Sequence, residues 1–250
     1  MRLLGIIGYP LGHSFSQGYF TEKFRNENLP DYVYRKFEIP SIEYLLPLLD
    51  TEKDLCGFNV TIPYKVQVMK YLDEIDEAAS EIGAVNTVKV SRAGGRVSLK
   101  GFNTDAPAFR MSLLENLVEI PETALVLGTG GASKSVRHIL TELGIRPLPV
   151  SRTSAPGVFS YKTIPKDEIT AAGLIVNTTP VGTFPDINAC PPLDYSCLRQ
   201  GQLLFDLIYN PPLTQFLKHG EDHECYIVNG EQMFRYQAEM AWKIWTDTSK

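Results

Sequence analysis

A lysine after a short strand-like segment is the first candidate for chemistry. Residues 57–65 (GFNVTIPYK) are typical of a strand that ends in hydrogen-bonding side chains and a turn that begins a helix at Pro63, where proline fits the first helical turn. Lys65 would project from that turn, where the positive end of the helix makes an ammonium readier to give up a proton. The stretch predicts a proton-transferring lysine, with a solvated surface lysine as the alternative.

A glycine-rich turn is the second candidate. It follows an apolar strand at 124–127, opens a helix, and consists of Gly128, Thr129, Gly130, Gly131, Ala132 and Ser133. In the dinucleotide fingerprint the first glycine permits a tight turn, and the second lets a pyrophosphate approach the backbone at a helix amino end. Ser133 occupies the third position, which is usually glycine or alanine. This setting favours a dinucleotide site over a glycine-rich turn without a ligand.

The residues after the next predicted strand, 145–150, indicate which dinucleotide the chain would bind. NAD enzymes place a carboxylate there, about 20 residues after the glycine turn. This chain has Ser151, Arg152 and Thr153 instead. Because a guanidinium suits a 2′-phosphate, the sequence predicts NADP rather than NAD, with a loop arginine as the alternative reading of Arg152.

The composition is that of an ordinary globular protein of 250 residues with a formal net charge of −5. The chain has no excess of positive charge that would favour nucleic acid as a partner. No apolar run approaches membrane-spanning length and the N-terminus does not resemble a signal peptide, so we expect a cytoplasmic protein. The four cysteines are scattered without a paired-cysteine motif, which makes a metal site or a disulfide framework unexpected.

The elements that must position these residues follow from the apolar pattern. In the first half we expect strands at 3–8 and 32–39, a third in the opening stretch, helices at 17–28, 42–49 and 65–82, and a hairpin of 85–90 with 97–102. The acidic residues near position 75 would form a solvated helix face. A helix at 106–117 follows, capped by Thr104 or Asp105.

The second half alternates strands with helix-length segments. Strands are expected at 124–127, 145–150, 174–176, 203–207 and 226–228, with helices at 133–143 and 231–245. Such alternation implies crossover connections and a parallel sheet, so this half is predicted to be doubly wound α/β. The last helix carries Met233, Ala241, Trp242 and Trp245, an apolar surface that needs a partner.

A set of motifs in one order resembles the shikimate dehydrogenase family over essentially the whole chain. The motifs are GYPLGHSFS at 8–16, residues 57–65, GAVNT at 83–87, GFNTD at 101–105, residues 128–133, SRT at 151–153, NTTP at 177–180, DLIYNP at 206–211 and GEQM at 230–233 with Gln237. The resemblance implies an α/β protein of two domains. Residues 1–105, completed by the helix at 231–250, would form a substrate domain with a mainly parallel sheet, and 106–230 a Rossmann-type NADP-binding domain.

The resemblance also implies a reaction and its residues. The family reduces 3-dehydroshikimate reversibly to shikimate with NADPH, on the route to aromatic amino acids and without a metal. Lys65 and Asp105 resemble its catalytic pair. The substrate-binding set would be Ser14, Ser16, Thr61, Asn86, Tyr209 and Gln237. Besides the glycine turn, the cofactor contacts would be Arg152, Thr153, Leu207 and Gly230.

Two departures from the family pattern keep other interpretations open. The first motif continues with Gln17 and with Tyr19-Phe20 in place of the usual Ser-Pro and His-Asn pairs, and a second arginine after Arg152 is absent. The alternatives are a quinate or dual quinate/shikimate dehydrogenase that uses NAD, and a non-catalytic nucleotide-binding regulatory protein. We expect a monomer or a homodimer.

Overall fold

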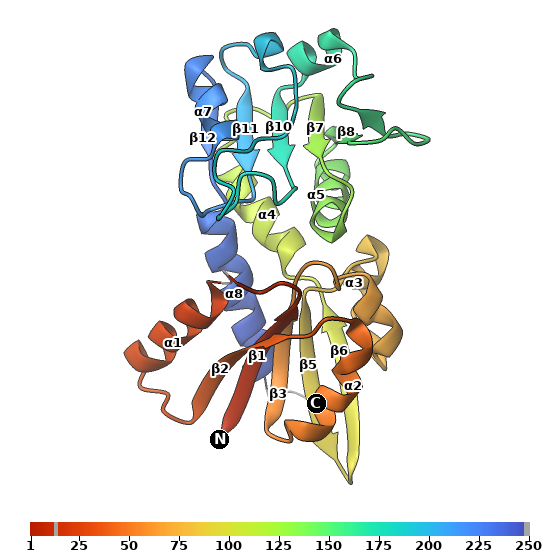
Figure 1. Ribbon diagram of the computed structural model, residues 1–250, viewed down its shortest axis with the longest axis vertical. Helices are drawn as coiled ribbons and strands as arrows, with labels where there is room; N and C mark the ends of the chain where they lie inside the picture. The colour runs from red at the N-terminus through yellow and green to blue at the C-terminus, as the bar shows by residue number, and fades with distance from the viewer. Residues whose placement is uncertain (13–14, 248–250) are drawn as a thin grey trace. The chain divides into compact units, whose positions relative to one another are not determined.

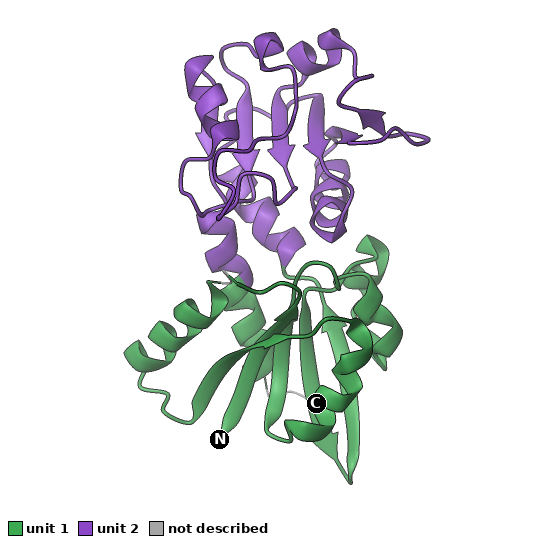
Figure 2. Cartoon of the chain, viewed as in Figure 1, with its two compact units in different colours: residues 1–104, 238–250 green, residues 105–237 purple. Residues whose placement is uncertain are grey.

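The computed structural model describes residues 1–12 and 15–247 and divides into two compact units (Figure 2). Unit 1 consists of Met1–Thr104 and Ala238–Lys250, and unit 2 of Asp105–Gln237. The second division therefore falls inside the last helix, α8 (Glu231–Thr246), whereas the sequence prediction placed it before that helix.

Unit 1 is built on a six-stranded sheet in the order β2-β1-β3-β5-β6-β4, most of which can be followed in Figure 1. Strand β1 pairs in parallel with β2 and β3, and β4 with β6, while β3–β5 and β5–β6 are antiparallel, so the sheet is mainly parallel as expected. The strands are β1 (Arg2–Gly8), β2 (Tyr32–Glu38), β3 (Leu55–Val60), β4 (Glu74–Ile75), β5 (Thr87–Ala93) and β6 (Arg96–Phe102).

Alternate side chains of β1 enter two separate cores, because successive residues of a strand face opposite sides of its sheet. Leu3 and Ile7 pack with residues of α2 and the 3₁₀ helix η2, whereas Leu4 and Ile6 pack with residues of α1 and α8. The carboxyl half of α8 is thus part of unit 1, which gives the apolar surface of the last helix its partner. The helices are α1 (Ser16–Asn26), η1 (Ile42–Tyr44), α2 (Leu45–Thr51), η2 (Gln67–Tyr71) and α3 (Glu77–Ile82).

The predicted hairpin is present, with β5 and β6 joined through Gly94 and Gly95. Both glycines have positive φ, +56° and +79°. Two consecutive residues with positive φ are what a two-residue hairpin turn requires when it follows the twist of its strands. The turn explains why glycine occupies both positions.

The single helix predicted over 65–82 is wrong, because within this range only Glu77–Ile82 forms an α-helix, α3. The Ile62–Pro63 peptide is cis, a turn follows, and η2 begins only at Gln67, so Lys65 does not lie in the first turn of a helix. Sheet pairing overrides the helical pattern further on, because Asp73 exchanges two hydrogen bonds with the Leu99 backbone and β4 pairs with β6. Glu74, expected on a solvated helix face, forms an ion pair with a lysine of β6.

Unit 2 contains a second six-stranded sheet, in the order β12-β11-β10-β7-β8-β9, in which every pair is parallel. Numbered from the first strand of the unit, this is the order 6-5-4-1-2-3 of the Rossmann fold. The sequence order reverses between β7 and β10, where such sheets bind their ligands. The strands are β7 (Thr123–Leu127), β8 (Arg146–Ser151), β9 (Phe159–Ser160), β10 (Leu174–Asn177), β11 (Leu203–Asp206) and β12 (Tyr226–Val228).

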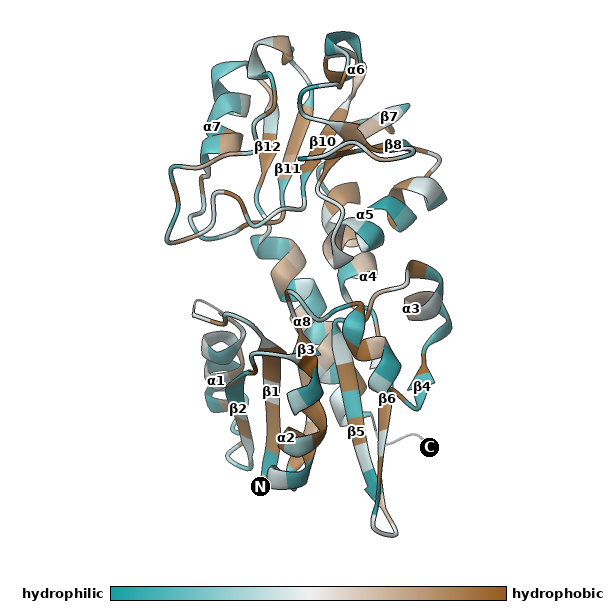
Figure 3. Ribbon diagram, turned by 45° about the vertical axis from the view of Figure 1, so that its right-hand side comes forward, coloured by the Kyte–Doolittle hydropathy of each residue, from teal (hydrophilic) through white to brown (hydrophobic). Residues whose placement is uncertain are grey.

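Helices cover both faces of this sheet, as two neighbouring residues of β11 show. Leu204 belongs to a core cluster with Phe216 of α7 and Ile169 of α6, whereas the Phe205 ring meets Phe109 of α4 edge to face at 5.3 Å. The predicted doubly wound α/β class is therefore confirmed, and Figure 3 shows that β1 of unit 1 and β10 of unit 2 are hydrophobic over most of their length. The helices are α4 (Asp105–Leu114), α5 (Gly131–Glu142), α6 (Lys166–Ala171), η3 (Tyr195–Cys197) and α7 (Gln215–Asp222).

Among the described residues, the helices are all too short or too polar to cross a membrane.

Candidate catalytic and cofactor sites

A buried polar network lies where β5 and β6 meet the end of unit 1. Asn86, 3% exposed, donates from Nδ2 to Thr104 Oγ1 at 2.9 Å and accepts the Thr104 backbone N–H at 2.7 Å. Thr87 and Asn59 extend the network through further hydrogen bonds. Thr104 is the last residue of unit 1, and Asp105 follows it as the buried first residue of α4, where a carboxylate suits the helix amino end.

Lys65 is half-buried and is held through its backbone. Its carbonyl accepts the N–H of Val85 at 2.8 Å, which ties the lysine to the residue before Asn86. On the other side, the Tyr64 hydroxyl donates to the Ile39 carbonyl at 2.7 Å and anchors the segment to the core. Lys65 is therefore positioned by the segment before β5 and by a buried tyrosine rather than by a helix.

Two other residues predicted for the substrate site lie in unit 1. Thr61 follows β3 directly, is half-buried, and donates its backbone N–H to the Ile7 carbonyl at 3.0 Å. Ser16 is the first residue of α1 and is 6% exposed. Ser14 lies outside the described residues.

Phe234 brings together two predicted substrate residues of unit 2. The Tyr209 ring stacks on the Phe234 ring with centroids 4.8 Å apart, and Gln237 Nε2 donates to the Phe234 carbonyl at 3.1 Å. Burial raises the pKa of Tyr209, so its hydroxyl stays protonated and available as a donor at neutral pH.

The glycine turn lies at the carboxyl end of β7, at the switch point of the parallel sheet. Gly128 has φ of +110°, and a Cβ there would lie 2.7 Å from Thr178 Oγ1, so only glycine fits without strain. Ser133 Oγ donates to the Gly128 carbonyl at 2.8 Å, which gives the third fingerprint residue a structural task. Gly130 is the N-cap of α5, with Gly131, Ala132 and Ser133 in its first turn.

Gly130 differs from Gly128 because nothing in the fold requires glycine there. Its φ is −79°, and a Cβ would meet no protein atom within 4 Å. A small side chain would instead occupy the space that a pyrophosphate needs when it approaches the amides of a helix amino end. The space is consistent with the predicted dinucleotide site.

Gly130→Ala is accordingly expected to raise the KM for NADPH at least about tenfold, which corresponds to about 1.4 kcal/mol of lost binding. Its stability should fall by roughly 1 kcal/mol or less, because alanine is a poorer N-cap than glycine. Initial rates at varied NADPH measure the first effect and thermal melting the second. Gly18→Ala, at an open position of α1, is the control. An unchanged KM in G130A would contradict a phosphate site at this turn.

The remaining predicted cofactor residues follow other strand ends of the same sheet. Arg152 and Thr153 are exposed just after β8. Burial raises the pKa of Tyr161 to about 12, and the nearby positive charge of Arg152 acts in the opposite direction. Leu207 follows β11 directly, and the neighbouring Ile208 carbonyl accepts the Gly230 N–H at 3.0 Å. The predicted cofactor residues thus follow the carboxyl ends of β7, β8 and β11, except Gly230, which is hydrogen-bonded to Ile208 after β11.

Sequence reasoning missed a buried carboxylate at this edge. Asp206, the last residue of β11, is fully buried, and burial raises its pKa to about 7 against the opposing effect of three hydrogen bonds. Asn177 and Thr214 supply two of these bonds. The motifs NTTP and DLIYNP contain Asn177 and Asp206, but their spacing did not indicate that the two side chains meet.

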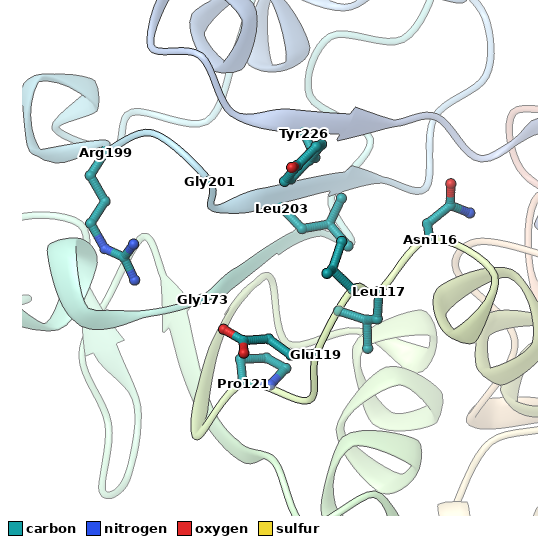
Figure 4. Close-up of a pocket in the computed structure, with 10 residues that line it drawn as sticks. Asn116, Leu117, Glu119, Pro121, Gly173, Arg199, Gly201, Leu203 and Tyr226 are labelled. Carbon is teal, nitrogen blue, oxygen red and sulfur yellow. The ribbon is translucent and has the colours of Figure 1, made fainter.

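A pocket of about 190 Å³ lies at the amino ends of the unit 2 strands, away from the glycine turn (Figure 4). Its lining includes Gly173, Leu203 and Tyr226, which stand at the amino ends of β10, β11 and β12. Dinucleotides bind parallel sheets at the carboxyl ends of the strands, so this pocket does not coincide with the predicted cofactor site.

Comparison with known proteins supports one family. Residues 6–88 match the model of the shikimate dehydrogenase substrate binding domain. Shikimate dehydrogenase (NADP(+)) of Methanocaldococcus jannaschii is 36% identical, with 98% of this chain and 91% of that protein covered. A crystal structure of a shikimate dehydrogenase in complex with NADP+ superposes with a TM-score of 0.87 at 33% identity, covering 98% of this chain and 90% of that one. The Thermus thermophilus enzyme in complex with NADP(H) and shikimate gives a TM-score of 0.84 at 31% identity, covering 98% of this chain and 94% of that one.

The fold and the glycine turn define the class, an α/β protein of two units of which one is a Rossmann-type domain. Similarity at this level over nearly the whole chain identifies the family within that class. The chain belongs to the shikimate dehydrogenase family.

Proposed function

We propose that this protein is an NADP-dependent shikimate dehydrogenase that reversibly reduces 3-dehydroshikimate to shikimate. The observation that carries the proposal is the match to NADP-dependent shikimate dehydrogenases over 98% of the chain. The glycine turn at the switch point and an arginine in place of the acid after β8 support it independently. The reaction places the protein in aromatic amino acid biosynthesis.

We assign most of the substrate-binding residues to unit 1 and NADP binding to unit 2. The matched substrate-domain segment, residues 6–88, falls within unit 1, and the Rossmann strand order belongs to unit 2. Gly128 to Ser133 would bind the pyrophosphate, and Arg152 with Thr153 the 2′-phosphate. Leu207 and Gly230 would contact the rest of the cofactor.

The proposed reaction requires a proton donor and hydrogen-bond partners for the substrate in fixed positions. The bound cofactor supplies the hydride. Lys65 would give a proton to the oxygen that gains charge, and Asp105 would orient that ammonium. Shikimate carries hydroxyls and a carboxylate, which neutral polar side chains can recognise. The proposed set is Ser14, Ser16, Thr61, Asn86, Tyr209 and Gln237.

The side chain of Asn86 already makes hydrogen bonds within the protein. Its Nδ2 donates to Thr104, and its Oδ1 accepts from Thr104 and from Thr87, so the amide supports the fold of unit 1 besides any contact with the substrate. Asn86→Ala should therefore affect both substrate KM and the stability of unit 1. Thermal melting beside initial rates at varied shikimate separates the two effects.

Initial rates on shikimate and on quinate, each with NADP and with NAD, test the proposal. We expect shikimate with NADP to give the highest kcat/KM. Quinate with NAD as the best pair would favour the quinate dehydrogenase alternative, which the missing second arginine keeps open. NADP binding without turnover of either substrate would favour a non-catalytic regulatory protein.

We further propose that the protein works in the cytoplasm as a monomer or homodimer. Fractionation of the source cells and light scattering of the purified protein test these two statements.

A further inference from the structure

The Asp206 carboxylate lies where three strands end at the switch point of unit 2. Asp206 pairs in register with Asn177, and Asn177 with Leu127, so the last residues of β11, β10 and β7 lie side by side. Asp206 Oδ1 accepts from Asn177 Nδ2 and from the Ile208 N–H, both at 3.0 Å, and Oδ2 accepts from Thr214 Oγ1 at 2.6 Å. Both Asp206 and Thr214 are fully buried.

From Asp206 the network reaches the glycine turn. Asn177 Oδ1 accepts from the backbone and the hydroxyl of Thr179, at 3.0 Å and 2.7 Å. Thr178 Oγ1 donates to the Leu127 carbonyl at 2.6 Å and lies against Gly128. The carboxylate therefore sets where the 178–179 loop packs on the turn that would hold the pyrophosphate.

The other side of the network reaches the segment after β11. The Ile208 N–H binds Asp206, and the Ile208 carbonyl accepts the Gly230 N–H. A Cβ on Gly230 would overlap the Leu207 carbonyl, so the two segments are in close contact. Thr214 caps α7 through the Leu217 N–H at 3.3 Å and thereby fixes the far end of this loop.

We propose that Asp206 is a positioning residue, which joins the glycine turn to the Leu207–Gly230 contact and so sets the geometry of the cofactor site. This inference rests on the proposed function, because it assumes that a dinucleotide binds at this edge. Nothing in it requires Asp206 to touch the cofactor. A buried carboxyl group that accepts bonds from Asn177, Ile208 and Thr214 costs free energy to desolvate, and a positioning role explains its presence.

Asp206→Asn is the principal test. The side chain keeps its size but exchanges one acceptor oxygen for a donor, which then faces a donor among Asn177, Ile208 and Thr214. If the segments around it move apart to relieve this mismatch, NADPH has to re-form the site when it binds, and its affinity falls. We expect KM and Kd for NADPH to rise about tenfold or more, with KM for shikimate unchanged.

A second pair of variants keeps the test decisive if D206N does not fold. Thr214→Val removes the donor to Oδ2 and the cap of α7, whereas Thr214→Ser keeps both. T214V should weaken NADPH binding and T214S should restore it. Asp194→Asn is the matched control, since Asp194 also accepts bonds from a hydroxyl and a backbone N–H but is only partly buried and caps η3.

The outcomes separate this inference from the proposed function. Binding is measured by the fluorescence of NADPH on titration with protein, without shikimate. If the wild-type protein binds no NADPH, the proposed function and this inference fail together. If it binds NADPH and the Asp206 and Thr214 variants bind equally well, this inference alone is wrong. Equal rises in both KM values would also overturn it, because they would indicate an effect that is not confined to the cofactor site.

Discussion

Lys65→Ala is expected to lower kcat for shikimate oxidation about 100-fold or more, the usual contribution of general acid–base catalysis. The substrate KM should change little, because the proposed task of the lysine is to move a proton rather than to bind. The segment itself should remain in place, since the Lys65 backbone, through Val85, and the buried Tyr64 hydroxyl hold it. Initial rates at saturating NADP with varied shikimate give both parameters.

Lys70→Ala is the matched control for this prediction. Lys70 is exposed, lies on η2 five residues further along, and belongs to the same half of unit 1. K70A should retain the wild-type kcat. A K65A protein that folds normally and keeps its kcat would show that another group transfers the proton, and the assignment of Lys65 would then be wrong.

The surroundings of Lys65 differ from the sequence prediction. The expected helix dipole does not act there, because no helix begins at Pro63. What the structure provides is a half-buried lysine whose backbone is tied to the residue before Asn86. The proposal for Lys65 therefore depends on the family motif and on this placement, and no longer on the amino end of a helix.

The strands β7, β10 and β11 of unit 2 were predictable because they are buried along their whole length. Each is a short, nearly continuous apolar run, and the carboxyl-end loops carry the glycines and hydroxyls that the fold needs there. The glycine turn was recognised from its setting between a strand and a helix. The positive φ at Gly128 and the open space at Gly130 provide the physical reasons for two of its glycines.

Local pattern failed where distant partners decide the structure. Residues 65–82 have helical apolar spacing, but Asp73 and β4 find hydrogen bonds on β6, about 25 residues further along the chain. The Asp206 network was missed for the same reason: Asn177 lies 29 residues before its partner and Thr214 lies eight after it. Register in a parallel sheet brings such residues together, and composition alone does not reveal it.

As the pH rises from 4 to 7, the free energy of unfolding of the wild-type protein should fall relative to that of an Asp206→Asn variant. Burial raises the pKa of Asp206 from 3.8 to about 7. The folded state therefore holds a proton that the unfolded chain has lost within this window, and stability falls as pH rises where the folded state binds more protons. A shift of about three pH units corresponds to on the order of 4 kcal/mol.

Urea unfolding of both proteins at several pH values measures this difference, because titrations elsewhere in the chain cancel between them. Asp194→Asn tests the sign. Hydrogen bonds from Ser196 and Lys166 lower the pKa of Asp194 to about 2, so its contribution is lost only as the pH falls below about 3.8, and D194N should follow the wild-type curve from pH 4 to pH 7. Burial raises the pKa of the nearby Tyr195, with the Asp206 charge adding to the rise, so this phenol stays neutral throughout.

A constant difference between wild type and D206N from pH 4 to pH 7 would mean that Asp206 does not change its protonation on folding. The three donors around it would then outweigh its burial and keep the carboxylate ionised across the window. A carbon-13 titration of the Asp206 carboxyl group would report the same choice directly in the folded protein. A transition near pH 7 supports the prediction, and one near pH 4 or below contradicts it.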